Sequence, residues 1–214
     1  MHARLVLRVS VLALWPALAL AQSPKAATYL TDEQVKAINS LPGVDRQIVT
    51  TDIGKLNLSV GIVHRGSTTA PAPAAAGGGG GAAAAQQGAP CGETSSAAAG
   101  AGTASGISHD GQTETYIIVS GTGTLVTGGK IINGRKSPPE SEVTKVLNGP
   151  SCSGAIAGSD VVRRKVKTGD IIVIPAGVPH GWTDIIDHVD YLSVRPDPER
   201  VLAAGYVNPA VAKK

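Results

Sequence analysis

Apolar and polar residues alternate one by one in several stretches of this chain, which predicts strands. Leu56, Leu58, Val60 and Ile62 are separated by single asparagine, serine or glycine residues, and this period of two marks a strand with one buried face. His64 falls on the same parity, so a regular strand would point it inward. We expect either a buried, hydrogen-bonded histidine there or a residue that contributes to a site.

A helical period is confined to a short stretch before these strands. Thr31 and Gln34 have the spacing of a capping box, and apolar residues follow at helical intervals up to the Pro-Gly pair at residues 42–43. We assign residues 22–45 to a polar leader and a short helix that packs on the outside of a larger body.

Further apolar runs of strand length follow, each bounded by glycine, proline or other turn residues. They cover residues 116–120, 124–127, 161–166, 171–174, 182–186 and 188–194. Gly121-Thr-Gly123, between the first two runs, is interpreted as a hairpin turn. Many short strands and very little helix favour an all-β sandwich or barrel, which we place at residues 46–195.

Two stretches interrupt this pattern. Residues 67–106 contain a run of five glycines in an alanine-rich sequence that cannot form a core, so we expect a flexible insertion between strands. Residues 133–160 are rich in proline, glycine and serine and predict a second long connection. After the barrel, residues 196–214 are expected to form a tail with a short helical piece at 199–204.

The first residues have the order of a secretory signal peptide. Arg4 and Arg8 precede an apolar run that ends in Ala19-Leu20-Ala21, an A-x-A cleavage site. The run is shorter than the ~20 residues that span a bilayer, which favours a cleaved peptide at residues 1–21 over an uncleaved anchor. We therefore expect an exported protein, periplasmic or secreted, with no membrane span after cleavage.

Composition narrows the class of protein. Loss of two arginines with the signal peptide lowers the formal charge from +3 to about +1, which gives no electrostatic basis for binding nucleic acid or an acidic membrane. The chain has no phenylalanine, and Trp182 is its only tryptophan after residue 21. Its core must consist mainly of valine, isoleucine and leucine, which favour strands.

The two cysteines, Cys91 and Cys152, predict a disulfide. An isolated pair in an exported protein is more often a bridge than a redox or metal site. The bridge would close a loop of roughly 60 residues and stabilise the fold by about 4 kcal/mol in the chain-entropy model.

Three residues at the ends of predicted strands suit a metal site. His180 follows a strand and a rigid Pro-Ala-Gly turn that begins at Pro175, and His109 and Glu114 bracket a tight loop before another strand. Two imidazoles and one carboxylate suit a borderline divalent ion and leave positions for water or substrate. Each residue also has an ordinary interpretation: a surface His109, a solvated Glu114 or a structural His180.

Residues 169–180 and 107–121 resemble the two sequence motifs of the cupin superfamily. The first stretch reads Gly, five residues, Pro-x-Gly, two residues and His, although Asp184 stands where the motif ends in asparagine. The second has His109, Glu114 and a glycine at the motif spacing, but Ile107 replaces the first histidine of the motif.

The resemblance implies a double-stranded β-helix, the cupin-like jelly-roll barrel, here with a short N-terminal helix and two long loop insertions. It also implies a divalent metal ion held by three histidines and a glutamate, of which this chain supplies His109, Glu114 and His180. The metal would be Fe, Mn, Zn or Ni. His64 is a candidate for the missing ligand.

The resemblance further implies a metal-dependent enzyme that acts on a small molecule inside the barrel, by dioxygenation, isomerisation or decarboxylation. Tyr116, Trp182 and Arg65 lie near the motifs and are candidates to line the pocket, while core packing is the ordinary interpretation of the two aromatic residues. The alternatives are a non-catalytic cell-envelope protein that binds a small ligand or metal, and a structural domain with a vestigial site. Similar barrels commonly pair through edge strands, so we also expect a homodimer.

Overall fold

The computed structural model describes residues 26–68, 88–96 and 103–211. The predicted signal peptide and most of the predicted insertion at 67–106 lie outside the described residues. Within the described ranges, no helix is both long and apolar enough to cross a membrane.

The single α-helix of the described residues, α1 (Asp32–Asn39), begins as predicted. The Thr31 side chain accepts a hydrogen bond from the Gln34 N–H, and the Gln34 side chain accepts one from the Thr31 N–H. This reciprocal capping satisfies two N–H groups that a helix leaves unpaired at its start. Ile38 is the fully buried residue of α1 and packs against β1 and β2.

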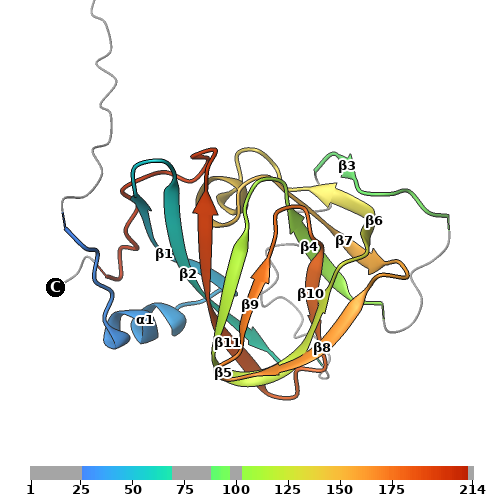
Figure 1. Cartoon of the computed structure of the whole chain (residues 1–214), viewed down its shortest axis with the longest axis horizontal. Coiled ribbons are helices and arrows are strands. Elements are labelled where there is room, and N and C mark those ends of the chain that lie inside the picture. The colour runs from blue at the N-terminus through green and yellow to red at the C-terminus, as the bar shows by residue number, and fades with distance from the viewer. Residues whose placement is uncertain (1–25, 69–87, 97–102, 212–214) are drawn as a thin grey trace, which may run out of the picture.

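The rest of the described chain consists mainly of antiparallel strands (Figure 1). The strands are β1 (Asp45–Asp52), β2 (Asn57–Gly66), β3 (Pro90–Cys91), β4 (Ser105–His109), β5 (Glu114–Thr127), β6 (Lys130–Lys136), β7 (Ser151–Ala157), β8 (Val162–Lys167), β9 (Ile171–Ile174), β10 (His180–Thr183) and β11 (His188–Asp197). A single π-helical turn, η1 (Val143–Leu147), lies between β6 and β7.

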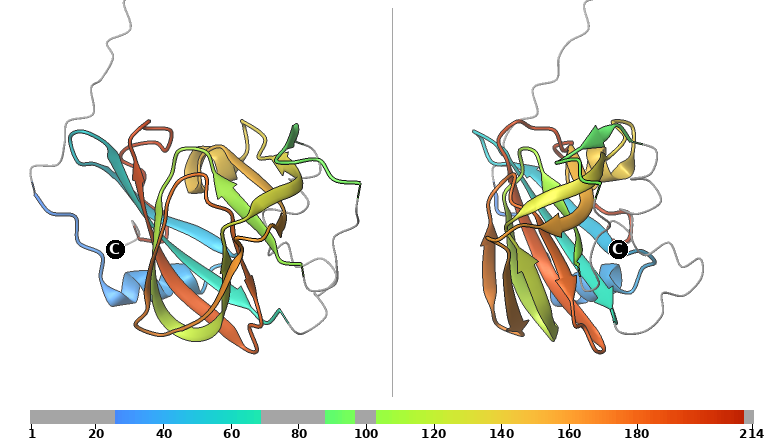
Figure 2. Two further views of the ribbon diagram at one scale, coloured as in Figure 1. Left: turned by 45° about the vertical axis from the view of Figure 1, so that its right-hand side comes forward. Right: turned by 90° about the vertical axis from the view of Figure 1, so that its right-hand side faces the viewer.

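The strands form two sheets that share β5. One sheet has the order β1-β2-β11-β5-β9, and the other has the order β8-β5-β10-β4-β7-β6-β3. The main apolar core draws residues from both sheets, among them Val63 of β2, Val166 of β8 and Trp182 of β10. The core therefore lies inside a barrel, with α1 on the outside (Figure 2). This is the double-stranded β-helix predicted from the motifs.

The predicted hairpin turn at Gly121-Thr-Gly123 is wrong, because β5 continues through it. Gly121 has φ +74°, and a Cβ there would lie 2.0 Å from the carbonyl oxygen of His188. Before this point β5 pairs with β9 and β11, and after it β5 pairs with β8 and β10. The glycines let one long strand bend from one sheet into the other, as the curved ribbon in Figure 1 shows.

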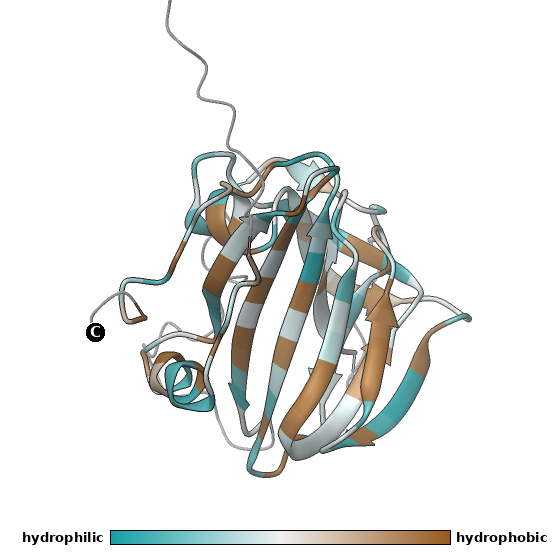
Figure 3. Cartoon of the chain, turned by 60° about the vertical axis from the view of Figure 1, so that its left-hand side comes forward, coloured by the Kyte–Doolittle hydropathy of each residue, from teal (hydrophilic) through white to brown (hydrophobic). Residues whose placement is uncertain are grey.

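The predicted inward direction of His64 is also wrong. Ile62, two residues before it, packs with Ile38 of α1 and Ile48 on the outer face of the first sheet, so the apolar parity of β2 faces the helix and not the barrel interior. Figure 3 shows the alternating bands of apolar and polar residues on these strands, with α1 beside them. Val63 faces the main core instead. Periodicity identified a strand but could not tell which of two covered faces was the interior.

Two predicted loops differ from expectation. Residues 133–160 contain η1, most of β6 and all of β7, and these strands were missed because serine and glycine replace the usual alternation of apolar residues. Residues 199–204 form turns and no helix; the Asp197 carboxylate accepts a hydrogen bond from the Leu202 N–H at 2.7 Å, and Arg200 has φ +55°.

The predicted disulfide between Cys91 and Cys152 is confirmed. It joins β3, a two-residue edge strand, to β7 across a separation of 61 residues. The residue before Cys152 in β7 is Ser151, which is opposite His109 of β4 in the strand pairing. The bridge therefore fastens a strand that lies next to the candidate metal residues.

Candidate metal centre

The fold brings His109, Glu114 and His180 together inside the barrel. His109 ends β4, Glu114 begins β5 and His180 begins β10. Their exposed fractions are 3%, 2% and 3%, and each offers one donor atom within 4.8 Å of the other two. The two stretches that carry the sequence motifs thus supply one cluster, although a loop and several strands separate them along the chain.

The second nitrogen of each histidine is held by a hydrogen bond. The Nδ1 atom of His180 lies 3.0 Å from the carbonyl oxygen of Val178, which can only accept, so the proton is on Nδ1. Ser151 donates its hydroxyl proton to the carbonyl oxygen of Gly149, so its Oγ accepts from Nδ1 of His109 at 2.9 Å. In their neutral forms both histidines therefore present an unprotonated Nε2 to the cluster.

The Glu114 carboxylate faces these nitrogens with one of its two oxygens. Its Oε2 lies 3.0 Å from Nε2 of His109 and 3.0 Å from Nε2 of His180, and it accepts a hydrogen bond from the Tyr116 hydroxyl at 2.9 Å. Nε2 of His180 is buried, and although it is close to Oε2, the geometry is not that of a hydrogen bond, so this nitrogen has no hydrogen-bond partner among the described residues.

The ionisation of the cluster follows from burial and charge. Burial opposes ionisation of Glu114, but its attraction to His109 when that imidazole is protonated, and to the charge of Arg195, outweighs burial and holds the pKa of the Glu114 carboxyl well below its usual value. Burial lowers the pKa of His109 more than Glu114 raises it. Burial, followed by the negative charge of Glu114, raises the pKa of Tyr116 well above its usual value, so Tyr116 is a neutral hydrogen-bond donor.

These residues fit a divalent cation. Two imidazole nitrogens and one carboxylate oxygen converge in the interior, and one of the nitrogens, Nε2 of His180, has no hydrogen-bond partner among the described residues. Metal-binding histidines typically donate their other N–H to a carbonyl or similar acceptor, as both do here. Two histidines and a carboxylate are the donor set of several Fe, Mn and Zn sites.

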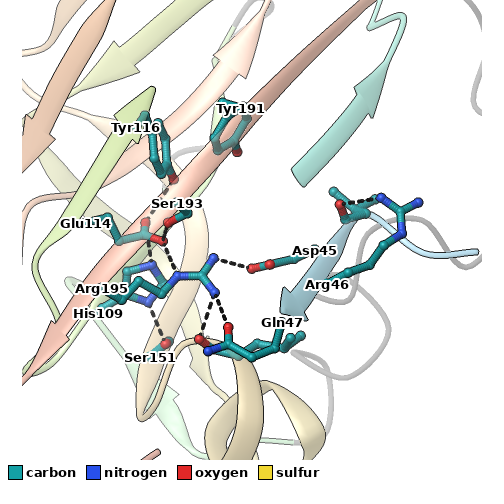
Figure 4. A network of polar contacts seen from close by, with 12 residues as sticks. Asp45, Arg46, Gln47, His109, Glu114, Tyr116, Ser151, Tyr191, Ser193 and Arg195 are labelled. Carbon is teal, nitrogen blue, oxygen red and sulfur yellow. Dashed lines mark hydrogen bonds and ion pairs between the residues drawn. The ribbon is translucent and has the colours of Figure 1, made fainter. Parts of the chain in front are cut away.

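A second set of buried polar residues binds the other oxygen of Glu114, and none of them was among the predicted site residues. Arg195 of β11 contacts Glu114 and Asp45, and Ser193 of the same strand also donates to Glu114 (Figure 4). Tyr191, Ser193 and Arg195 alternate along β11 on its interior face. A serine and an arginine on the parity of a buried aromatic residue were the available signal.

Ile107 occupies the position where the motif has its first histidine. In the strand pairing it is opposite His180, and it lies two residues before His109 in β4. Residues directly opposite each other, and residues two apart in a strand, share a face of the sheet. Ile107 therefore faces the cluster and contributes an alkyl group where a fourth donor is expected.

The other predicted pocket residues have different places. His64 binds the Asp190 carboxylate at 2.6 Å on the outer face and cannot replace the missing ligand. Arg65 donates to the Tyr191 hydroxyl at 3.0 Å, and Trp182 stacks on the Tyr191 ring with centroids 5.4 Å apart. Of the four additional residues, Tyr116 alone touches the cluster, through its hydrogen bond to Glu114.

Comparison with known proteins gives distant likenesses only. The sequence matches no protein-family model, and a search of curated proteins finds no match. Among solved structures, the chain is similar to an uncharacterized protein with a double-stranded β-helix domain from Klebsiella pneumoniae, with 13% identity, a TM-score of 0.35, and coverage of 81% of this chain and 92% of that one. It is also similar to an oxalate oxidase, with 14% identity, a TM-score of 0.34, and coverage of 74% and 54%.

A third similar structure is a DMSP lyase from Ruegeria pomeroyi, with 11% identity and a TM-score of 0.32. The match covers 67% of this chain but 39% of the lyase, so the chain spans about two fifths of the length of that protein. The cupin fold of the present chain follows from its own strand order and from the three motif residues that meet inside the barrel.

Proposed function

We propose that this protein is an exported cupin-type enzyme that binds a divalent metal ion through His109, Glu114 and His180 and acts on a small molecule. The observation that carries the proposal is the convergence of three buried donor atoms, one of which, Nε2 of His180, has no hydrogen-bond partner among the described residues. A buried nitrogen lone pair with no hydrogen-bond donor is unfavourable, and a cation bound among the three atoms would compensate it. A vestigial site would have no reason to keep the hydrogen bonds that aim both histidines.

The chain's own residues would hold the ion and exclude water from it. A bound ion in such a site supplies a Lewis acid that polarises an oxygen of the substrate or a position for dioxygen. Ser151 and the Val178 carbonyl orient the two imidazoles. Tyr116, which is neutral and buried, donates a hydrogen bond to the carboxylate oxygen that faces the cluster. Dioxygenation, isomerisation and decarboxylation are the reaction classes to test.

Export is supported by two independent features. The A-x-A sequence at residues 19–21 follows a basic and then an apolar segment. The disulfide between Cys91 and Cys152 is of the kind that persists in oxidising compartments. N-terminal sequencing of the protein from its native source should find Gln22 as the first residue. Light scattering would test the expected homodimer.

A non-catalytic role, in which the barrel holds a metal without turnover, is the second candidate. It is favoured by the closure of the site, because the three donor residues are at most 3% exposed and Tyr116, Trp182 and Tyr191 pack beside them in the core. Stoichiometric metal without turnover of any oxidisable or decarboxylatable metabolite in a product screen would favour this role over catalysis.

Elemental analysis of the native protein and of the His109→Ala, Glu114→Ala and His180→Ala variants tests metal binding. We expect near-stoichiometric metal in the native protein and its loss from each variant. His64→Ala is the matched control, because His64 is bound to Asp190 on the outer face, and it should keep its metal. Metal content that survives all three interior substitutions would exclude this site.

A further inference from the structure

Arg195 is the most elaborately bound side chain beside the candidate metal centre. It is 1% exposed and comes from β11, and it binds Glu114 through the carboxylate oxygen that does not face the histidines (Figure 4). Its Nε donates to Oε1 of Glu114 at 2.8 Å, and one terminal nitrogen lies 2.6 Å from Oδ2 of Asp45 in β1. The other terminal nitrogen donates to the Leu147 carbonyl at 2.9 Å.

These contacts give the two oxygens of Glu114 different roles. Oε1 accepts from Arg195 at 2.8 Å and from the Ser193 hydroxyl at 2.8 Å, so both of its lone pairs are used. Oε2 faces the two histidines. A carboxylate can bind a metal through one oxygen or through both, and here the second oxygen is already satisfied.

We propose that Arg195 is a positioning residue that restricts Glu114 to a single coordinating oxygen, so that the centre takes its metal through three protein atoms and no more. This inference rests on the proposed metal-binding function. It also agrees with Ile107 at the fourth position. Ile107 offers no donor atom and the second oxygen of Glu114 is already hydrogen-bonded, so three protein atoms remain to bind the ion.

The restraint is rigid because Arg195 is fixed from three directions. Asp45 lies in β1 and Leu147 ends η1, whereas Glu114 lies in β5, so rotation of the carboxylate would break contacts that tie three separate elements together. Burial opposes the charge of Arg195, but Asp45 and Glu114 outweigh it and raise its pKa. The guanidinium therefore stays charged and keeps its planar set of donors.

The test is Co²⁺ binding to the full mature chain, because the visible spectrum of Co²⁺ reports the number of coordinating atoms. Arg195→Lys retains a positive charge, but one ammonium group cannot bridge Asp45 and Glu114 as a guanidinium does. Oε1, which then keeps only its hydrogen bond from Ser193, should join the ion, which raises the coordination number and weakens the visible absorption. We also expect Co²⁺ affinity to fall by about tenfold to a hundredfold, because a carboxylate that is no longer held in place loses more affinity through lost orientation than its second oxygen adds.

Arg200→Lys is the matched control. Arg200 pairs with the Asp52 carboxylate at 2.8 Å and is partly exposed, so this substitution also shortens an arginine–aspartate pair but leaves Glu114 untouched. Its Co²⁺ spectrum and affinity should equal those of the native chain. Circular dichroism of each variant establishes that it is folded.

Ser193→Ala keeps the test decisive if Arg195→Lys does not fold. It removes the other donor to Oε1 and should change the spectrum in the same direction by a smaller amount. A folded Arg195→Lys, or failing that Ser193→Ala, with the native spectrum and affinity would overturn the positioning role alone. A native chain that takes up no Co²⁺ would overturn the proposed function itself.

Discussion

Ile107 decides how many donor atoms the interior cluster can offer. It faces the cluster from β4, opposite His180, and its alkyl side chain cannot bind a metal. Ile107→His would supply a fourth donor at the position where the cupin motif has one. We expect Zn²⁺ affinity to rise by about tenfold or more, because each good ligand adds to a site that is already oriented.

Competition with a coloured chelator would measure this change. Ser108→His is the control, because Ser108 is the next residue of β4 and so faces the opposite side of the sheet. It should leave the affinity unchanged. Equal gains from the two substitutions would mean that the added histidine binds Zn²⁺ elsewhere.

The ionisation of His109 and Glu114 predicts how stability depends on pH in the metal-free protein. The pKa of His109 lies below 6.5 and that of Glu114 well below 4.5 in the folded chain, so the unfolded chain binds more protons as the pH falls. The stabilisation from His109 is complete above pH 6.5 and is lost as the pH falls through its folded pKa. The stabilisation from Glu114 is likewise lost as the pH falls, but at lower pH.

Urea unfolding in the presence of a chelator, between about pH 7 and pH 5, would measure this slope. The free energy of unfolding should decrease steadily toward acid. His109→Gln should reduce the slope in this range, since glutamine does not titrate. A native slope that is flat or rises toward acid would contradict the assignment of a neutral, buried His109.

At the scale of the elements, β5 depends on glycine where it passes between the sheets. Gly121 combines φ +74° with a backbone so close that an added Cβ would lie 2.0 Å from the His188 carbonyl oxygen. Gly121→Ala should therefore destabilise the fold by about 2 kcal/mol or more, through strain at positive φ together with displacement of β11.

Gly66→Ala is the matched control, because no atom of the described residues lies within 4 Å of a Cβ at Gly66 and its φ is ordinary. Thermal unfolding of the two variants should show a large decrease in stability for Gly121→Ala and little change for Gly66→Ala. Similar behaviour of both would mean that β5 does not need its bend at this glycine.

The strands that the sequence predicted are those whose apolar period is set by contact with a core. In β2 this period identified the strand but led to the wrong interior face, because α1 covers the outer face and demands apolar residues there as well. Strands β6 and β7 escaped detection because their glycines and serines approach one another closely and follow no such period. A pattern of apolar residues along one segment does not show which other segment covers its outer face, or which strands approach closely.

The candidate site shows the same limit. His109, Glu114 and His180 were predictable because two motifs fix their spacing along the chain. Arg195 was not predictable from the sequence. Its role depends on the position of β11 between β2 and β5, because this arrangement brings Asp45 and Glu114 to the two ends of one guanidinium group. The parity that Arg195 shares with Tyr191 in β11 indicates a buried arginine, but it does not show which acidic residues that arginine meets.

At the scale of the whole molecule, β7 carries both Cys152 of the disulfide and Ser151, which hydrogen-bonds His109 of the candidate metal centre. Cys152 bonds to Cys91 across 61 residues, and its loss should reduce stability by about 4 kcal/mol in the chain-entropy model. For a chain of this size we expect the melting temperature of the Cys91→Ser, Cys152→Ser double variant to fall by roughly 10 °C. Equal melting temperatures for variant and native chain would contradict a stabilising bridge.

Metal binding should survive the loss of the bridge. Two restraints place Ser151 beside His109. The first is the pairing of β4 with β7, which joins five residues of each strand and ends at the pair His109–Ser151. The second is the hydrogen bond that the Ser151 hydroxyl donates to the Gly149 carbonyl. Neither restraint passes through sulfur. We therefore expect the double variant to bind Co²⁺ with the native spectrum at temperatures where it is folded, and reduction of the native protein to give the same result. A spectral change on reduction would show that the bridge, and not the strand pairing, orients His109.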